Sequence, residues 1–136
     1  MTTYQIFTDG GSRGNPGMAS CAFVVYDSQN KLIFQNGVSL GITTNNVAEY
    51  TAVLNAVDWM DPESEASFKL DSLLVVQQLK GNFKIKDAKL KVILEKILLI
   101  IKNKKLKIFW THIPREQNTI ADLLVNNTLD GEHENE

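Results

Sequence analysis

The sequence has one cysteine and no long apolar run, and these two scarcities exclude an intramolecular disulfide and a membrane-spanning helix. The apolar neighbours of Cys21 predict a small buried side chain, which favours a reducing compartment. The longest apolar run, ILLII at residues 97–101, is far shorter than the roughly 20 residues of a membrane helix. The N-terminus lacks the basic and then apolar stretches of a signal peptide. We therefore expect a cytoplasmic protein with no membrane partner.

Neither sign of charge dominates the chain, whose formal net charge is -2, but lysines gather in one segment. Ten lysines stand between Lys80 and Lys107, against two carboxylates, Asp87 and Glu95. Such a run is either the solvated face of a helix or a surface that binds phosphates. The apolar fraction of 43% predicts a single globular domain, which we place at residues 1–129. The polar segment 130–136 is expected to be a disordered acidic tail.

Residue periodicity predicts an α/β fold of the mixed α+β kind, in the order βββαβααβα. Segments rich in β-branched and aromatic residues, separated by turn residues, predict strands at residues 3–9, 19–27, 31–38, 67–71 and 106–112. Helical spacing of apolar residues predicts helices from residue 45 to the proline at 62, and at residues 72–81, 87–105 and 115–129. A hairpin followed by two crossover units implies a five-stranded mixed sheet flanked by helices.

The apolar positions also predict which helix faces meet the core. In the first helix, Tyr50, Val53, Leu54 and Val57 share one face, and Thr44 is a natural N-cap. The third helix carries apolar residues well beyond one stripe, so we expect it to be largely buried with a lysine-rich edge. In the last helix, we expect Ile120, Leu123 and Leu124 to face the core.

Four carboxylates occupy comparable places in this scheme. Asp9 closes the first predicted strand, Asp71 closes the fourth, and Glu49 and Asp122 lie early in two helices. Each alone could be a turn or capping residue. Together, however, they can converge, because the carboxyl ends of neighbouring parallel strands meet at one edge of a sheet. Four clustered carboxylates raise one another's pKa values and require cations to offset their charge.

Hard divalent ions with oxygen ligands, Mg²⁺ or in its place Mn²⁺, suit such a cluster. Two ions about 4 Å apart can activate water on one side of a phosphodiester and stabilise the leaving oxygen on the other. The arrangement therefore predicts a nuclease site with two metal ions.

Four segments, TDGGSRGNPG, TTNNVAEYTAV, LDSLLVVQQLKG and HIPREQNTIADLL, in this order and at these separations, resemble the ribonuclease H family in its short type-1 form. The likeness runs from about residue 3 to residue 127. It implies an endonuclease that hydrolyses the RNA strand of RNA/DNA hybrids and leaves 5′-phosphate and 3′-hydroxyl ends. It also implies that Asp9, Glu49, Asp71 and Asp122 bind the metal ions.

The resemblance extends to residues that would contact the hybrid. Asn15, Asn45 and Asn46 match positions at which the family contacts the minor groove, where an amide can pair with a ribose 2′-hydroxyl. Thr44 resembles a phosphate contact on the DNA strand. All four could instead be turn and capping residues, and both roles can coexist. The glycines after Asp9 are expected to form a turn that lets a nucleic-acid strand come close to the sheet edge.

Two further residues of these segments are candidates for a role at the site. His112 stands where the family can carry a mobile histidine that assists product release, or it simply ends a strand. Arg115 is a candidate phosphate contact.

The chain has no room for the basic protrusion with which some longer family members bind hybrid. We therefore assign phosphate binding to the neighbouring lysines, Lys80, Lys84, Lys86, Lys89 and Lys91. Leu73 replaces a polar residue that often contacts RNA.

Two other functions fit the same features. One is another nuclease of the same fold, such as a resolvase or transposase, since fold alone does not choose among them. The other is a non-catalytic module that binds RNA/DNA hybrids, although the presence of all four carboxylates favours an enzyme. The absence of a P-loop lysine and hydroxyl from GGSRGNPG excludes a nucleotide-binding loop of that type. We expect a monomer acting on RNA/DNA hybrid.

Overall fold

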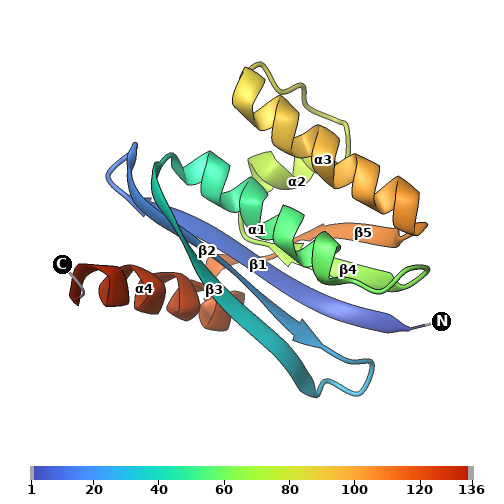
Figure 1. Ribbon diagram of the computed structural model, residues 1–136. Helices are drawn as coiled ribbons and strands as arrows, with labels where there is room; N and C mark the ends of the chain where they lie inside the picture. The colour runs from blue at the N-terminus through green and yellow to red at the C-terminus, as the bar shows by residue number, and fades with distance from the viewer. Residues whose placement is uncertain (1, 135–136) are drawn as a thin grey trace.

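A computed structural model describes residues 2–134 as one sheet with helices on both of its faces (Figure 1). The strands are β1 (Thr3–Arg13), β2 (Gly17–Tyr26), β3 (Leu32–Thr43), β4 (Glu65–Leu70) and β5 (Lys107–His112). The helices are α1 (Asn45–Trp59), α2 (Leu73–Leu79), α3 (Ala88–Lys104) and α4 (Thr119–Glu134), with a 3-10 turn at Arg115–Gln117.

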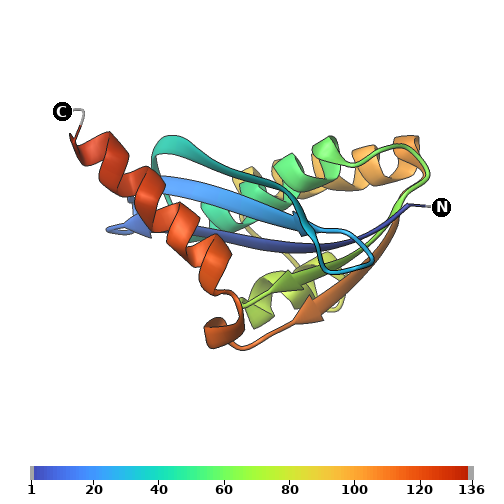
Figure 2. The ribbon, with the colours of Figure 1, turned by 90° about the horizontal axis from the view of Figure 1, so that it is seen from below.

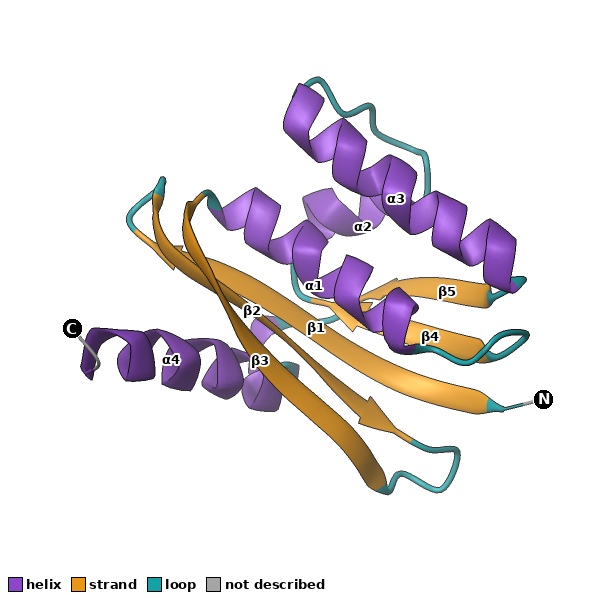
Figure 3. Ribbon diagram, in the orientation of Figure 1, coloured by secondary structure: helices purple, strands orange, loops and turns teal. Residues whose placement is uncertain are grey.

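The sheet is mixed, as predicted. Its strand order is β3-β2-β1-β4-β5, with β2 antiparallel to both β1 and β3 and β4 parallel to both β1 and β5 (Figure 3). The hairpin strands therefore form one half, and the crossover strands extend the sheet from β1. This topology makes β1 and β4 parallel neighbours, which the predicted convergence of Asp9 and Asp71 requires.

The main core lies between the sheet and α1. Tyr50, Val53 and Val57 of α1 are fully buried against Ile6 of β1 and Phe68 of β4. Thr44 caps the helix, because its Oγ1 accepts a hydrogen bond from the Val47 amide at 3.2 Å. The predicted face and cap of this helix are confirmed.

Helix α4 covers the opposite face of the sheet, at the β1–β2–β3 end (Figure 2). Its buried residues, Ala121, Val125 and Leu129, recur every fourth position, and the last two form a cluster with Ala22 of β2. The predicted face was wrong for Ile120 and Leu123, which are 44% and 58% exposed, whereas Leu124 is partly buried and packs against this cluster. The prediction relied on the largest apolar side chains. The stripe that faces the sheet instead contains Ala121, Val125 and Leu129, because the position of the neighbouring strand determines which side of the helix is covered.

Helix α3 is less buried than predicted. Leu90 and Ile97 enter the core, and Leu94 and Ile101 pack at its margin. Val92, Leu98 and Leu99 are about half exposed. The helix lies outside α1 and contacts it along one side only (Figure 1), so its excess of apolar residues faces outward.

Several boundaries differ from those predicted. β1 is longer because the GGSR segment continues the β1–β2 ladder as far as Arg13 opposite Met18, and β3 is longer because it pairs with β2 as far as Thr43 opposite Gly17. Helix α4 extends to Glu134, so the first part of the expected disordered tail is helical; residues 135–136 lie outside the described residues. Within residues 2–134, none of the helices has both the length and the apolar character needed to cross a membrane.

Candidate active site

The backbone of two parallel strands places the first two carboxylates. The register of β1 and β4 pairs Phe7 with Lys69, and pairing between these strands ends there. Asp9 and Asp71 each follow two residues later. β1 continues along β2 to Arg13, whereas β4 ends at Leu70, so the two strands part at this point. Asp9 therefore lies within a strand, not at its end as predicted, but beside a gap in the sheet.

Gly10 brings the third carboxylate to this gap. A Cβ at Gly10 would lie 2.3 Å from the carbonyl carbon of Ala48 and 2.5 Å from the amide nitrogen of Glu49. Only a residue without a side chain allows α1 to pass so close to β1. The close approach that Gly10 allows is thus that of α1, which places Glu49 beside Asp9, and access for a nucleic-acid strand stays a prediction.

Asp9, Glu49 and Asp71 converge on one point. Each offers a carboxylate oxygen, and these oxygens lie within 4.8 Å of one another. Asp9 is buried, Asp71 is partly exposed, and Oε2 of Glu49 is buried with no hydrogen-bond partner. Asp122 is outside this triad but lines the same pocket of about 480 Å³, into which α4 brings it from the other face of the sheet. The structure thus gathers all four carboxylates around one cavity.

Burial and mutual repulsion raise the pKa values of two members of the cluster. The pKa of Asp9 rises from 3.8 to about 7, first because burial disfavours its charge and then because Asp71 and Asp122 repel it. The pKa of Glu49 rises well above its usual range, through burial and the charges of Asp9 and Asp71. A cation between these groups would reverse both effects, so the donor set fits a hard divalent ion.

Asn118 is a residue at this site that the sequence interpretation missed. Its side-chain amide, 1% exposed, donates hydrogen bonds to the Asp71 carboxylate at 3.1 Å and to the Thr8 carbonyl at 2.9 Å. The one available signal was its position four residues before Asp122 at a helix start, which is equally typical of an ordinary N-cap.

Two of the predicted hybrid contacts, Asn15 and Asn45, are linked beside the pocket, which Asn45 lines. Asn45 Oδ1 accepts hydrogen bonds from the amide and hydroxyl of Ser12, at 2.8 and 2.9 Å. Asn15 Oδ1 accepts one from the Asn45 amide at 3.0 Å. Both asparagines therefore have the turn-stabilising role. Asn15, Asn45 and Asn46 are nevertheless exposed. Thr44 has the capping role described above.

Arg115 and His112 differ in their relation to the pocket. Arg115 lines it, and its guanidinium lies 3.8 Å from Asp122 with 82% of the side chain exposed. His112 ends β5, is exposed, and is not among the residues that line the pocket. Arg115 is thus available both to Asp122 and to an incoming anion.

The predicted lysine surface is exposed. Lys80, Lys84 and Lys86 lie on the segment that joins α2 to α3, and Lys89 and Lys91 lie in the first turn of α3. One lysine of the run has a structural role instead: Lys104 Nζ donates hydrogen bonds to the Asp58 and Met60 carbonyls at 2.5 and 2.8 Å, where α1 ends.

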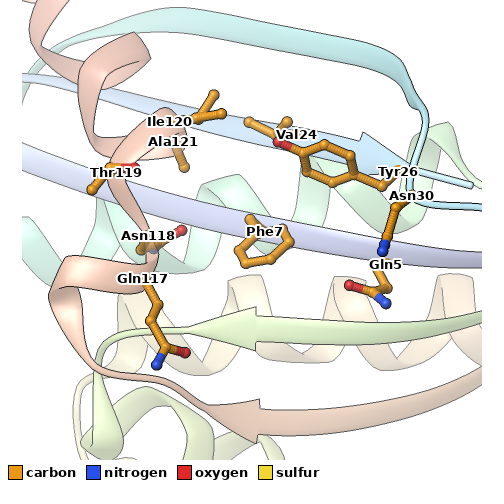
Figure 4. Close-up of a pocket in the computed structure, with 10 residues that line it drawn as sticks. All are labelled: Gln5, Phe7, Val24, Tyr26, Asn30, Gln117, Asn118, Thr119, Ile120 and Ala121. Carbon is orange, nitrogen blue, oxygen red and sulfur yellow. The ribbon is translucent and has the colours of Figure 1, made fainter.

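A second pocket, of about 200 Å³, opens beside the start of α4, on the same face of the sheet that this helix partly covers (Figure 4). Phe7 and Tyr26 form one wall, with their rings edge to face, and residues 117–121 form the other. Asn118 therefore lies between this pocket and the carboxylates.

Comparison with known proteins agrees with this geometry. A family model described as reverse transcriptase-like matches residues 7–128. The solved structure of LC11-RNase H1 in complex with an RNA/DNA hybrid matches with a TM-score of 0.86 and 37% identity, over 95% of this chain and 98% of that chain. This chain belongs to the ribonuclease H family.

Two curated relatives are longer than the region that they share with this chain. Ribonuclease HI of Halobacterium salinarum is 33% identical over 134 residues, which cover 91% of this chain and 63% of the relative. The bifunctional protein Rv2228c of Mycobacterium tuberculosis is 36% identical over 129 residues, covering 92% of this chain. The chain spans only 35% of that protein, so the likeness concerns a ribonuclease H domain and not the whole of it.

Proposed function

We propose that this ribonuclease H family member is an endonuclease that hydrolyses the RNA strand of RNA/DNA hybrids. The observation that carries the proposal is the approach of carboxylate oxygens from Asp9, Glu49 and Asp71 to within 4.8 Å, in a pocket that Asp122 also lines. A fold gathers such charges only where cations offset them. The relative from Halobacterium salinarum is named ribonuclease HI, and LC11-RNase H1 was solved with a hybrid bound.

The cofactors proposed are two Mg²⁺ ions, with Mn²⁺ as a substitute. The donor set is all carboxylate oxygen, which suits hard ions. Glu49 Oε2, buried and unpartnered, is the kind of orphaned atom that a bound cation would satisfy. Asp9, Glu49, Asp71 and Asp122 would hold the ions. When bound, such ions supply a water nucleophile at neutral pH and stabilise the leaving oxygen of a phosphodiester.

The residues of this chain have separable parts in that reaction. The buried position of Asp9 and the close approach of α1 at Gly10 fix the carboxylates before substrate arrives. Arg115, exposed at the pocket, can bind the scissile phosphate. We propose that hydrolysis leaves 5′-phosphate and 3′-hydroxyl ends. All four carboxylates come from one chain, which supports a monomer as the active form.

The hybrid is proposed to lie across the pocket mouth. The exposed amides of Asn15, Asn45 and Asn46 would contact the minor groove, where a ribose 2′-hydroxyl distinguishes RNA from DNA. Thr44 would contact the DNA strand. The exposed lysines between α2 and α3 would bind phosphates further along. His112 is assigned no contact in the pocket, and a role in product release stays a proposal.

The decisive experiment is a cleavage assay with end-labelled RNA/DNA hybrid, duplex DNA and duplex RNA of one sequence, in Mg²⁺ and in EDTA. We expect cleavage of the RNA strand of the hybrid alone, in Mg²⁺ alone, and none by Asp9→Asn. Cleavage of duplex DNA would identify a nuclease of another specificity within the fold. Hybrid binding without cleavage in Mg²⁺ or Mn²⁺ would identify a binding module.

A further inference from the structure

Asn118 joins three of the four carboxylate positions. Its side chain donates to Thr8, the residue before Asp9, and directly to Asp71. Its backbone carbonyl accepts the amide of Asp122 at 3.1 Å, in the first turn of α4. No other described residue is bonded to all three of these neighbours. Strand β1, the end of β4 and the start of α4 are therefore tied together at one buried amide.

The chemistry of the two acceptors determines how this side chain is oriented. A peptide carbonyl and an ionised carboxylate can only accept, so the NH₂ group of Asn118 must face them. Its oxygen is then turned to a buried place where it has no hydrogen-bond partner. An unsatisfied buried acceptor is unfavourable by about 1–3 kcal/mol, and a leucine of similar size would avoid that penalty. The amide is thus poorly explained by stability alone.

Substrate contact does not explain Asn118 either. With 1% of its surface exposed, it cannot touch a nucleic acid that enters the pocket. Asp71, by contrast, follows the end of β4 directly and is partly exposed, so neither the strand ladder nor full burial holds it in place. The bond from Asn118 fixes one of its oxygens and leaves the other free for the cluster.

We infer that Asn118 is a positioning residue, which orients the Asp71 carboxylate toward the divalent cation and couples it to Asp9 and Asp122. The inference rests on the proposed function, since it concerns the same ions. Groups that orient metal ligands commonly change metal affinity or activity by about 10–100-fold when removed. The expected signature is weaker cation binding with unchanged binding of the hybrid.

The test measures Mg²⁺ affinity directly, without substrate, by amide chemical shifts in NMR titrations of the full chain. Asn118→Ala removes the donor, and Asn118→Leu removes it while filling the space. Asn55→Ala is the matched control, because Asn55 is a partly buried amide that bonds Cys21 Sγ, away from the pocket. Both Asn118 variants should bind Mg²⁺ about 10–100-fold more weakly. Their kcat should fall while KM for the hybrid stays within about twofold of wild type, and Asn55→Ala should change only thermal stability.

A second comparison separates positioning from general loosening of the fold. If Asn118 acts through Asp71, adding Asn118→Ala to Asp71→Asn should weaken Mg²⁺ binding no further. The inference is overturned if Asn118→Ala weakens Mg²⁺ binding equally in the wild-type protein and in Asp71→Asn. It is also overturned if Asn118→Ala and Asn118→Leu bind Mg²⁺ as tightly as wild type. Should neither variant fold, the side-chain amide signals of Asn118 in the unaltered protein decide: they should shift with the Mg²⁺ midpoint, and a lack of response refutes the role. If wild type binds no divalent cation, the proposed function itself fails.

Discussion

Asp9 within β1 and Asp71 just after β4 lie at equivalent distances along two parallel strands, each two residues beyond the paired residues Phe7 and Lys69. Because β4 stops at Leu70 while β1 continues, the sheet opens between them. Glu49 reaches this opening from α1 on one face, and Asp122 lines it from α4 on the other. The cluster therefore depends on sheet and helix packing together, and each part can be tested separately.

Asp9→Asn should stabilise the metal-free protein at neutral and higher pH but not in acid. The pKa of Asp9 is raised in the folded state, from 3.8 to about 7, so folding becomes less favourable as pH rises through this range. The free energy of unfolding, measured in EDTA by urea titration, should be higher in the variant by up to about 4 kcal/mol at pH 8. At pH 4 the difference should nearly vanish. Equal stabilities at both pH values would show that Asp9 is not repelled in this cluster.

Asp71→Asn should reduce cleavage of the hybrid more than about 100-fold, because loss of a direct metal ligand should exceed the effect of losing a group that orients one. Asp130→Asn is the control: Asp130 is an exposed carboxylate of α4 that pairs with Arg13. It should keep nearly full activity. Initial rates in Mg²⁺ and circular dichroism of each variant check the prediction, and near-normal turnover by Asp71→Asn would remove that residue from the site.

Gly10→Ala should destabilise the fold by about 1–3 kcal/mol, because the new Cβ would overlap the α1 backbone at Ala48. Relief by moving α1 would displace Glu49, so activity should fall even at temperatures where the variant is folded. In Gly131→Ala of α4, the added Cβ meets nothing within 4 Å, so stability should be kept or raised by about 0.5–1 kcal/mol. Thermal unfolding and cleavage rates measure both effects. A Gly10→Ala protein as stable as wild type contradicts the proposed close approach.

Lys84→Ala and Lys86→Ala should each weaken hybrid binding and flatten its dependence on salt. If each lysine contacts one phosphate, the slope of log affinity against log salt should become shallower by about 1 per substitution. Lys31→Ala, on the β2–β3 hairpin, provides a control with the same change of charge. Fluorescence anisotropy in EDTA over a range of salt concentrations gives the slopes. Identical slopes for all three variants would assign the lysines to a solvated surface.

The sequence by itself determined the order of elements, the mixed sheet and the four carboxylates worth examining. It could do so because these depend on local patterns: alternation in strands, the apolar face of α1 with its cap at Thr44, and acidic residues at element ends. The resemblance of four segments to ribonuclease H then supplied the family, which the comparisons confirmed.

Only the tertiary structure decided how the site is built. Gly10 belongs to a strand because the β1–β2 ladder continues through it, and it is a glycine because α1 passes against it. The buried face of α4 uses Val125 and not Leu123, since the neighbouring strand sets the contact. Asn118 meets Asp71 across 47 residues of sequence. Such contacts arise when distant segments pack, and no local pattern records them.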